Sequence, residues 1–175
     1  MEKSRLFLSL SMIIAVSILL LSCSPKAYAL KYGPSSYSSY PAYYNTHALP
    51  APKFFKHKVL KMLVEIDYPN LKRWNYAIAV MSNVMKAFGY NSLKYKIELV
   101  AFGAGLKMIM PKFDKKNEAV LQSLVSYGLK IRGCHNTMLK LHLTKKALFP
   151  FVRVVPAGVL EVARRGMQGY VLLKP

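Results

Sequence analysis

From residue 57 onward, segments with a strand-like pattern alternate with segments with a helix-like pattern in this 175-residue chain. Apolar runs at 58–67 and 95–102 are typical of buried strands. Residues 71–88 between them carry apolar side chains at steps of three and four, which predicts a helix. Such alternation favours a mainly parallel sheet with helices on both faces. We therefore predict a three-layer α/β/α, flavodoxin-like fold with about five strands.

The same alternation continues to the C-terminus. The further elements that we expect are a short helix at 106–110 closed by Pro111, a helix at 117–127, a strand at 129–133, a short helix at about 137–143, one turn at 145–148, a strand at 152–155, a helix at 156–165 and a last strand at 169–173. In parallel sheets, ligands bind at the carboxyl ends of the strands. Three groups follow such ends and should gather on one edge of the sheet, namely Asp67 to Asn70, Gly103 to Gly105 and Cys134.

Residues 1–29 have the pattern of a secretory signal. A short basic start precedes an apolar stretch of 16 residues from Leu6 to Leu21, which is short for a stable membrane span. Cleavage before Leu30 would release the rest of the chain. Alternatively, Cys23 would become the lipidated first residue of a lipoprotein, and an uncleaved anchor is a third option. All three options predict export to the periplasm or cell envelope.

Residues 30–56 are rich in Tyr, Ser and Pro and show no apolar period. This composition is typical of a linker or tether rather than of a folded unit. The folded domain is therefore predicted at 57–175, and a spacer of this kind suits a domain held off a membrane by a lipid anchor.

The chain is strongly basic, with 26 Lys and Arg residues against 7 Asp and Glu residues and a formal net charge of +19. A field of this strength attracts anions, and nucleic acid would be the first candidate in a cytosolic protein. Export disfavours nucleic acid as a partner, and the lysines are scattered along the whole chain. Lipid headgroups, cell-wall polymers and small oxyanions remain as anionic partners, beside a basic surface without any specific partner.

Cys134 is the one cysteine outside the N-terminal region, because the only other cysteine is Cys23. An exposed thiol in an exported protein is at risk of oxidation. Cys134 is therefore a candidate reactive thiol. The alternative is that it is a small buried apolar residue, which is the usual role of a free cysteine.

The predicted position of Cys134, between a strand and a helix, favours its thiolate form, because helix starts and cations lower the pKa of a thiol. The backbone N–H groups of Asn136, Thr137 and Met138 could point toward the sulfur. Arg132 and Lys140 lie near it in sequence and could steer an anionic compound.

Other chemistries have weaker support. Soft ligands near Cys134 could suit copper, namely His135, Met138 and His142. Because adjacent residues rarely chelate one metal well, we predict no metal and no cofactor. No Gly-x-Ser-x-Gly elbow of a serine hydrolase occurs. The segment from Gly103 to Gly105 is only half of a dinucleotide fingerprint. It predicts either a tight turn or an anion-binding loop.

Four segments of the chain resemble the DsrE/DsrF-like (YchN-like) family, most closely its small exported single-domain members. They are KVLKMLVEIDYPNLKRWNYAIAVMSNVMKAFG, YKIELVAFGAGLKMIM, GLKIRGCHNTMLK and VVPAGVLEVARRGMQGYVLLKP, and together they span about Lys58 to Pro175. The Cys-x-Asn-Thr-Met and V-P-A-G-V pieces are the most specific. The resemblance implies a three-layer α/β/α fold and a homo-oligomer, often a trimer or hexamer.

In the best-understood members of that family, a cysteine accepts sulfane sulfur as a persulfide and passes it on. The matching position here is Cys134, followed by the matching Asn136 and Thr137, while Gly103 and Gly105 match the glycine-containing loop of the family. The resemblance thus implies a sulfur relay or sulfurtransferase-like carrier. Its partners would be an inorganic or protein-bound sulfur donor and an acceptor. The high positive charge departs from many family members.

Three functions therefore stay open. The first is a cell-envelope sulfur carrier in which Cys134 holds the persulfide. The second is a non-catalytic module that binds an anion or small ligand and in which Cys134 is structural. The third is a membrane-tethered oligomer whose basic surface and Tyr-rich tether bind an envelope partner.

Overall fold

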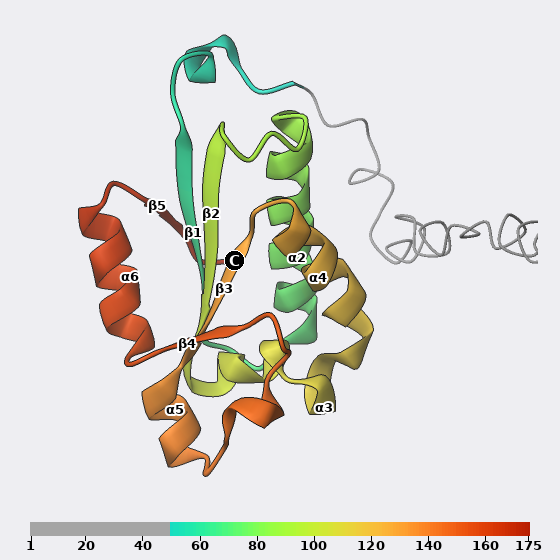
Figure 1. The fold of residues 1–175 in the computed structure, drawn as a ribbon, viewed down its shortest axis with the longest axis vertical. Coiled ribbons are helices and arrows are strands. Elements are labelled where there is room, and N and C mark those ends of the chain that lie inside the picture. The colour runs from blue at the N-terminus through green and yellow to red at the C-terminus, as the bar shows by residue number, and fades with distance from the viewer. Residues whose placement is uncertain (1–49) are drawn as a thin grey trace, which may run out of the picture. The chain divides into compact units, whose positions relative to one another are not determined.

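Five parallel strands form a single sheet in the order β4-β3-β2-β1-β5 in this computed structural model (Figure 1). The structure describes residues 50–175. The strands are β1 (Leu60–Ile66), β2 (Tyr95–Ala101), β3 (Lys130–Cys134), β4 (Arg153–Val155) and β5 (Val171–Leu173). The predicted signal segment, Cys23 and residues 30–49 of the predicted linker lie outside the described residues.

Helices connect the strands and cover the sheet. They are α2 (Leu71–Ala87), α3 (Pro111–Asp114), α4 (Glu118–Ser126), α5 (His135–Lys140) and α6 (Gly158–Met167), with 3-10 turns η4 (Lys53–Phe55), η5 (Gly103–Ile109), η6 (Lys115–Asn117) and η7 (Lys145–Ala147). Figure 1 shows α2 and α4 on one side of the sheet and α6 on the other. The predicted α/β/α class with a parallel sheet of five strands is thus confirmed.

The path of the chain explains why α6 lies on the other side of the sheet from α2 and α4. The strands β1 to β4 add in one direction, and the chain then returns past them so that β5 pairs with β1. A crossover between parallel strands is right-handed in nearly all proteins. Because the step from β4 to β5 runs opposite to the earlier steps, its helix lies on the opposite face.

The two faces of the sheet differ in polarity. The face toward α2 and α4 is apolar and buried, with Val64, Leu99 and Ile131 in neighbouring register. The face toward α6 includes Glu98 and Arg132, which belong to the alternate set of side chains. The main hydrophobic core therefore lies between the sheet and the α2–α4 layer.

Several boundaries differ from the predicted ones. Pro111 begins α3 instead of closing a helix, because proline fits the first turn of a helix, where no N–H is needed. The helix α5 begins at His135, two residues earlier than predicted, so that Cys134 itself is its N-cap. The helix α6 begins at Gly158 rather than at Pro156. The 3-10 turn η4 lies inside the predicted linker, and the ring of Phe55 contacts that of Phe88.

Candidate functional site

The carboxyl ends of β1, β2 and β3 meet at one edge of the sheet, as the sequence predicted. Just after β2, the N–H of Phe102 donates a hydrogen bond to the carbonyl of Ile66, at 3.0 Å. The segment η5 follows immediately and begins at Gly103. One strand further along, β3 ends at Cys134. The candidate site residues from these three strand ends are therefore neighbours in space.

Cys134 is buried at the junction of β3 with two helices. Its residue is 5% exposed, and α5 starts at the next position. Its side chain belongs to the face of the sheet that α6 covers, two residues after Arg132 in the alternating strand. The first residue of α6, Gly158, supplies a backbone N–H to the sulfur. Two segments far apart in sequence thus converge on this thiol.

Hydrogen bonds lower the pKa of the Cys134 thiol. Burial acts in the opposite direction and is the largest single influence, but four donors together outweigh it. These are the hydroxyl of Thr137 and the backbone N–H groups of Gly158, Thr137 and Asn136. Donors that face a sulfur atom stabilise its negative charge and so favour the thiolate over the thiol. Of the three N–H groups predicted to face the sulfur, those of Asn136 and Thr137 contribute to the shift, whereas that of Met138 does not.

Thr137 connects the cysteine to the glycine-containing loop. Its Oγ1 accepts a hydrogen bond from the N–H of Gly103 at 2.9 Å. A hydroxyl that accepts in this way keeps its own proton available for a second partner, and that partner is the sulfur of Cys134. Gly103 has a φ of +53°, a left-handed conformation that glycine adopts at little cost. The predicted residues Gly103 and Thr137 are therefore joined by a hydrogen bond, and the hydroxyl of Thr137 lowers the pKa of Cys134.

Gly105 acts through close packing rather than through a hydrogen bond to the sulfur. A Cβ at this position would lie 2.5 Å from the carbonyl carbon of Ile66 and 2.7 Å from the nitrogen of Asp67, and closer still to the Ile66 oxygen. Only glycine lets η5 approach the end of β1 this closely. The residue thus fixes the position of the loop that carries Gly103.

Gly158 is a site residue that was not singled out from the sequence. Its N–H faces Cys134, and a Cβ here would lie 2.8 Å from the Cβ of Phe102. Next to it, the carbonyl of Pro156 accepts a hydrogen bond from the N–H of Asn136 at 3.2 Å. The signal in the sequence was the V-P-A-G-V segment, in which a glycine follows a strand and starts a helix.

Arg132 is not exposed at the edge of the sheet. Its guanidinium lies 3.4 Å from the carboxylate of Glu98, and its side chain is 12% exposed. Arg165 of α6 binds the same carboxylate at 2.7 Å. The charge of Arg132 is therefore paired with that of Glu98, between the sheet and α6. By contrast, Lys140 is the last residue of α5 and is exposed.

The soft ligands near Cys134 do not converge. His135 is exposed at the start of α5, whereas Met138 is buried. Within residues 50–175, no three His, Cys, Asp or Glu side chains come together as a metal site would require.

The third group at this edge, Asp67 to Asn70, has contacts that stabilise the fold. Asn70 caps α2 by accepting a hydrogen bond from the N–H of Arg73 at 3.1 Å, as predicted. Asp67 is bound by Lys174 at 2.7 Å. A shallow hollow of about 400 Å³ lies beside them and is lined by Tyr68, Pro69, Asn70 and Arg73.

The chain is similar in fold to a solved structure from Methanobacterium thermoautotrophicum, the protein of unknown function MTH1491. The TM-score is 0.60 at 23% sequence identity, and the match covers 66% of this chain and 99% of that chain. At this identity the likeness shows the fold alone. No family model matches the chain, and no curated protein matches it. Function therefore has to be argued from the site.

Proposed function

We propose that this protein is a sulfur carrier of the cell envelope, in which Cys134 holds sulfane sulfur as a persulfide. The observation that carries the proposal is the set of donors around its sulfur. The hydroxyl of Thr137 and the N–H groups of Asn136, Thr137 and Gly158 together lower the pKa of the thiol. A terminal persulfide sulfur is anionic near neutral pH, and the same donors suit a negative charge on sulfur.

The loading step is a displacement at sulfur. With thiosulfate as donor, the thiolate of Cys134 attacks the outer sulfur and forms a new S–S bond. The old bond between that sulfur and the sulfite sulfur breaks, and sulfite leaves with the electron pair of the bond. With a polysulfide, the leaving group is the polysulfide shortened by one sulfur atom. No net oxidation of the system occurs, so no further oxidant is needed.

The unloading step reverses this chemistry on an acceptor. A thiolate of the acceptor attacks the terminal sulfur of the persulfide, and Cys134 leaves again as a thiolate, which its donors stabilise. Lys140 is exposed near the site, and the chain is strongly basic, so anionic donors are attracted toward this edge. The N-terminal signal pattern supports a place in the cell envelope, and the family resemblance supports a homo-oligomer.

The test is mass spectrometry of the intact full chain after incubation with polysulfide or thiosulfate. We expect the protein to gain sulfur atoms at Cys134. The Cys23→Ser variant should gain sulfur to the same extent, because Cys134 remains. The Cys134→Ser variant should gain no sulfur at position 134, which mass spectrometry of the digested protein checks. Absence of an adduct on Cys134 with every donor would refute the carrier function.

The burial of Cys134 favours a second candidate, a non-catalytic module in which the cysteine is structural. A residue that is 5% exposed needs some local opening before a donor can reach its sulfur. In this case the native thiol should resist alkylation, and Cys134→Ala should leave the binding of small anions such as sulfite or phosphate unchanged.

A further inference from the structure

The edge of the sheet opposite Cys134 forms a surface of its own. Three segments contribute to it, namely residues 52–59 before β1, residues 88–94 before β2 and residues 127–129 before β3. We call this surface the amino edge. Figure 1 shows η4 and the start of β1 at one end of the sheet and α5, which follows Cys134, at the other end.

All charged residues of the amino edge are basic. Its exposed lysines are Lys53, Lys56, Lys58 and Lys94. None of the carboxylate residues in the described part of the chain belongs to these three segments. Those carboxylates lie elsewhere, as in the pairs of Glu98 with Arg165 and of Asp67 with Lys174. The lysines of the amino edge are thus not neutralised by acidic residues from its own segments.

Large apolar side chains stand among these lysines. Leu93 is 81% exposed and Phe54 is 65% exposed. The ammonium of Lys58 lies 3.7 Å from the centre of the Phe54 ring. Tyr90 and Tyr127 contribute a further exposed pair of rings, 4.5 Å apart. Apolar and aromatic side chains mixed with lysines are typical of surfaces that lie in the headgroup layer of a membrane.

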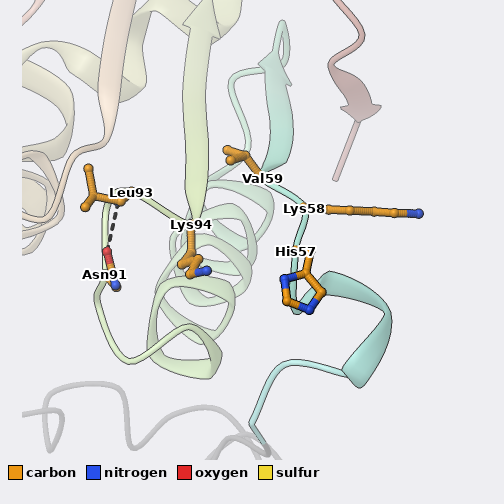
Figure 2. A pocket seen from close by; sticks show the side chains of 6 residues that line it. All are labelled: His57, Lys58, Val59, Asn91, Leu93 and Lys94. Atoms are coloured by element: carbon orange, nitrogen blue, oxygen red, sulfur yellow. Dashed lines mark hydrogen bonds between the residues drawn. The ribbon is translucent and has the colours of Figure 1, made fainter.

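A shallow hollow of about 410 Å³ lies in the amino edge. Figure 2 shows that its lining comes from two sides, with the segment before β1 facing the turn before β2. The lining residues are His57, Lys58, Val59, Asn91, Leu93 and Lys94. Lys94 lies between the two sides, whereas Lys58 extends away from the turn before β2 (Figure 2). These basic groups and the exposed apolar side chains next to them match the chemistry of an anionic headgroup and the start of its acyl chains.

The described part of the chain is joined to the N-terminal segment at this same edge. Residue 50 begins the described structure, and residues 51–59 lead directly into β1. Within residues 1–49, the run from Leu6 to Leu21 is apolar. A membrane anchor in that segment would raise the effective concentration of the amino edge at the bilayer. A basic patch is a common second signal beside a membrane anchor.

We propose that the amino edge docks on an anionic phospholipid bilayer, which leaves the Cys134 edge pointing away from the membrane. The lysines bind the lipid phosphates, while Leu93 and Phe54 enter the layer below the headgroups. This inference does not depend on the sulfur chemistry, because its residues lie at the opposite end of the sheet. A carrier held in this way would offer its cysteine to soluble donors and acceptors.

The experiment places a fluorescent probe at each end of the sheet in the full chain. Leu93→Trp marks the amino edge, and Leu139→Trp, 59% exposed in α5, marks the Cys134 edge as a matched control. Both variants are reconstituted with vesicles that contain phosphatidylglycerol with brominated acyl chains. We expect several-fold stronger quenching of the Leu93→Trp probe. The buried Trp74 adds the same background to both variants.

Charge variants separate lipid binding from mere proximity to the vesicle. Lys56→Glu, Lys58→Glu and Lys94→Glu combined should abolish the quenching of the Leu93→Trp probe. The same change of net charge at Lys112, Lys145 and Lys146, which lie outside the amino edge, should leave it intact. Circular dichroism checks that each variant is folded. Equal quenching of the two probes would overturn the proposal, and so would an unquenched Leu93→Trp probe, the result expected if the amino edge binds an acidic protein instead.

Discussion

At the scale of single residues, the hydroxyl of Thr137 helps to lower the pKa of the Cys134 thiol. It accepts from the N–H of Gly103 at 2.9 Å and donates to the sulfur. The backbone donors on Asn136 and Gly158 depend on the helix starts, so a side-chain substitution leaves them in place. Thr137 is thus the one donor that can be removed by mutation without changing the cysteine or the backbone.

We predict that Thr137→Val raises the pKa of Cys134, because a donor to the thiolate is lost while the β-branched shape is kept. The rate of alkylation by iodoacetamide near pH 7 should fall roughly tenfold, as expected for a hydrogen bond to a charged group. In a plot of rate against pH, the midpoint should move to higher pH. Thr137→Ser keeps the hydroxyl and should stay close to the wild type. A Thr137→Val profile that overlays that of the wild type would exclude this role.

At the scale of elements, the approach of η5 to the end of β1 sets the shape of the site edge. Gly105 lies against the backbone of Ile66 and Asp67, where a Cβ has no space. The same segment carries Gly103, whose N–H holds Thr137. Displacement of η5 therefore affects both the packing of the sheet edge and the orientation of the hydroxyl that faces the cysteine.

We predict that Gly105→Ala lowers the free energy of unfolding by about 2 kcal/mol or more, because rigid backbone must move to admit the methyl group. Urea unfolding measures the change. Gly166→Ala is the matched control, since nothing lies within 4 Å of a Cβ at that position in α6. It should raise the stability by about 0.5–1 kcal/mol, the usual advantage of alanine over glycine in a helix. Equal effects of the two substitutions would contradict the role of Gly105.

At the scale of the whole molecule, a buried ionic network joins α6 to the sheet. Glu98 is 0% exposed and binds Arg165 of α6 and Arg132 of β3. Glu161, one turn before Arg165 in α6, also contacts that arginine at 3.1 Å. The pKa of Glu161 falls to about 2, chiefly because the side chain of Arg164 donates a hydrogen bond to it. The network thus holds the helix whose first N–H faces Cys134.

We predict that Glu98→Ala costs about 3–5 kcal/mol of stability, because it leaves the largely buried guanidinium of Arg132 without its carboxylate and leaves Arg165 with Glu161 alone. Glu118→Ala removes the same charge from an ion pair with the exposed Lys115 and should cost less than about 1 kcal/mol. Denaturant unfolding of both variants provides the comparison. A small loss for Glu98→Ala would mean that the network contributes little to holding α6.

A second whole-molecule feature is the difference between the two ends of the sheet. The exposed lysines and apolar side chains of the amino edge lie at the opposite end of the sheet from Cys134. Within residues 50–175, no helix combines the length and apolar character needed to cross a bilayer. The amino edge is the surface that we propose for contact with a bilayer.

The sequence by itself determined the elements and part of the site. All five strands were predicted, because each is a short segment with apolar residues between the turns and helices that flank it, a pattern that is visible locally. Asn136 and Thr137 were predicted beside Cys134 because they follow it directly in the chain. Fine boundaries such as the start of α5 were wrong by about two residues, since capping depends on local geometry that periodicity does not report.

Only the tertiary structure decided which distant residues meet. Gly158 reaches Cys134 because β5 pairs with β1 and so places α6 on the face where the cysteine lies. Arg132 lies two residues from Cys134, yet its charge is engaged by Glu98 of the neighbouring strand. Apolar periodicity records which side of an element is buried. Which element covers that side depends on the order of strands in the sheet, and no local pattern carries that order.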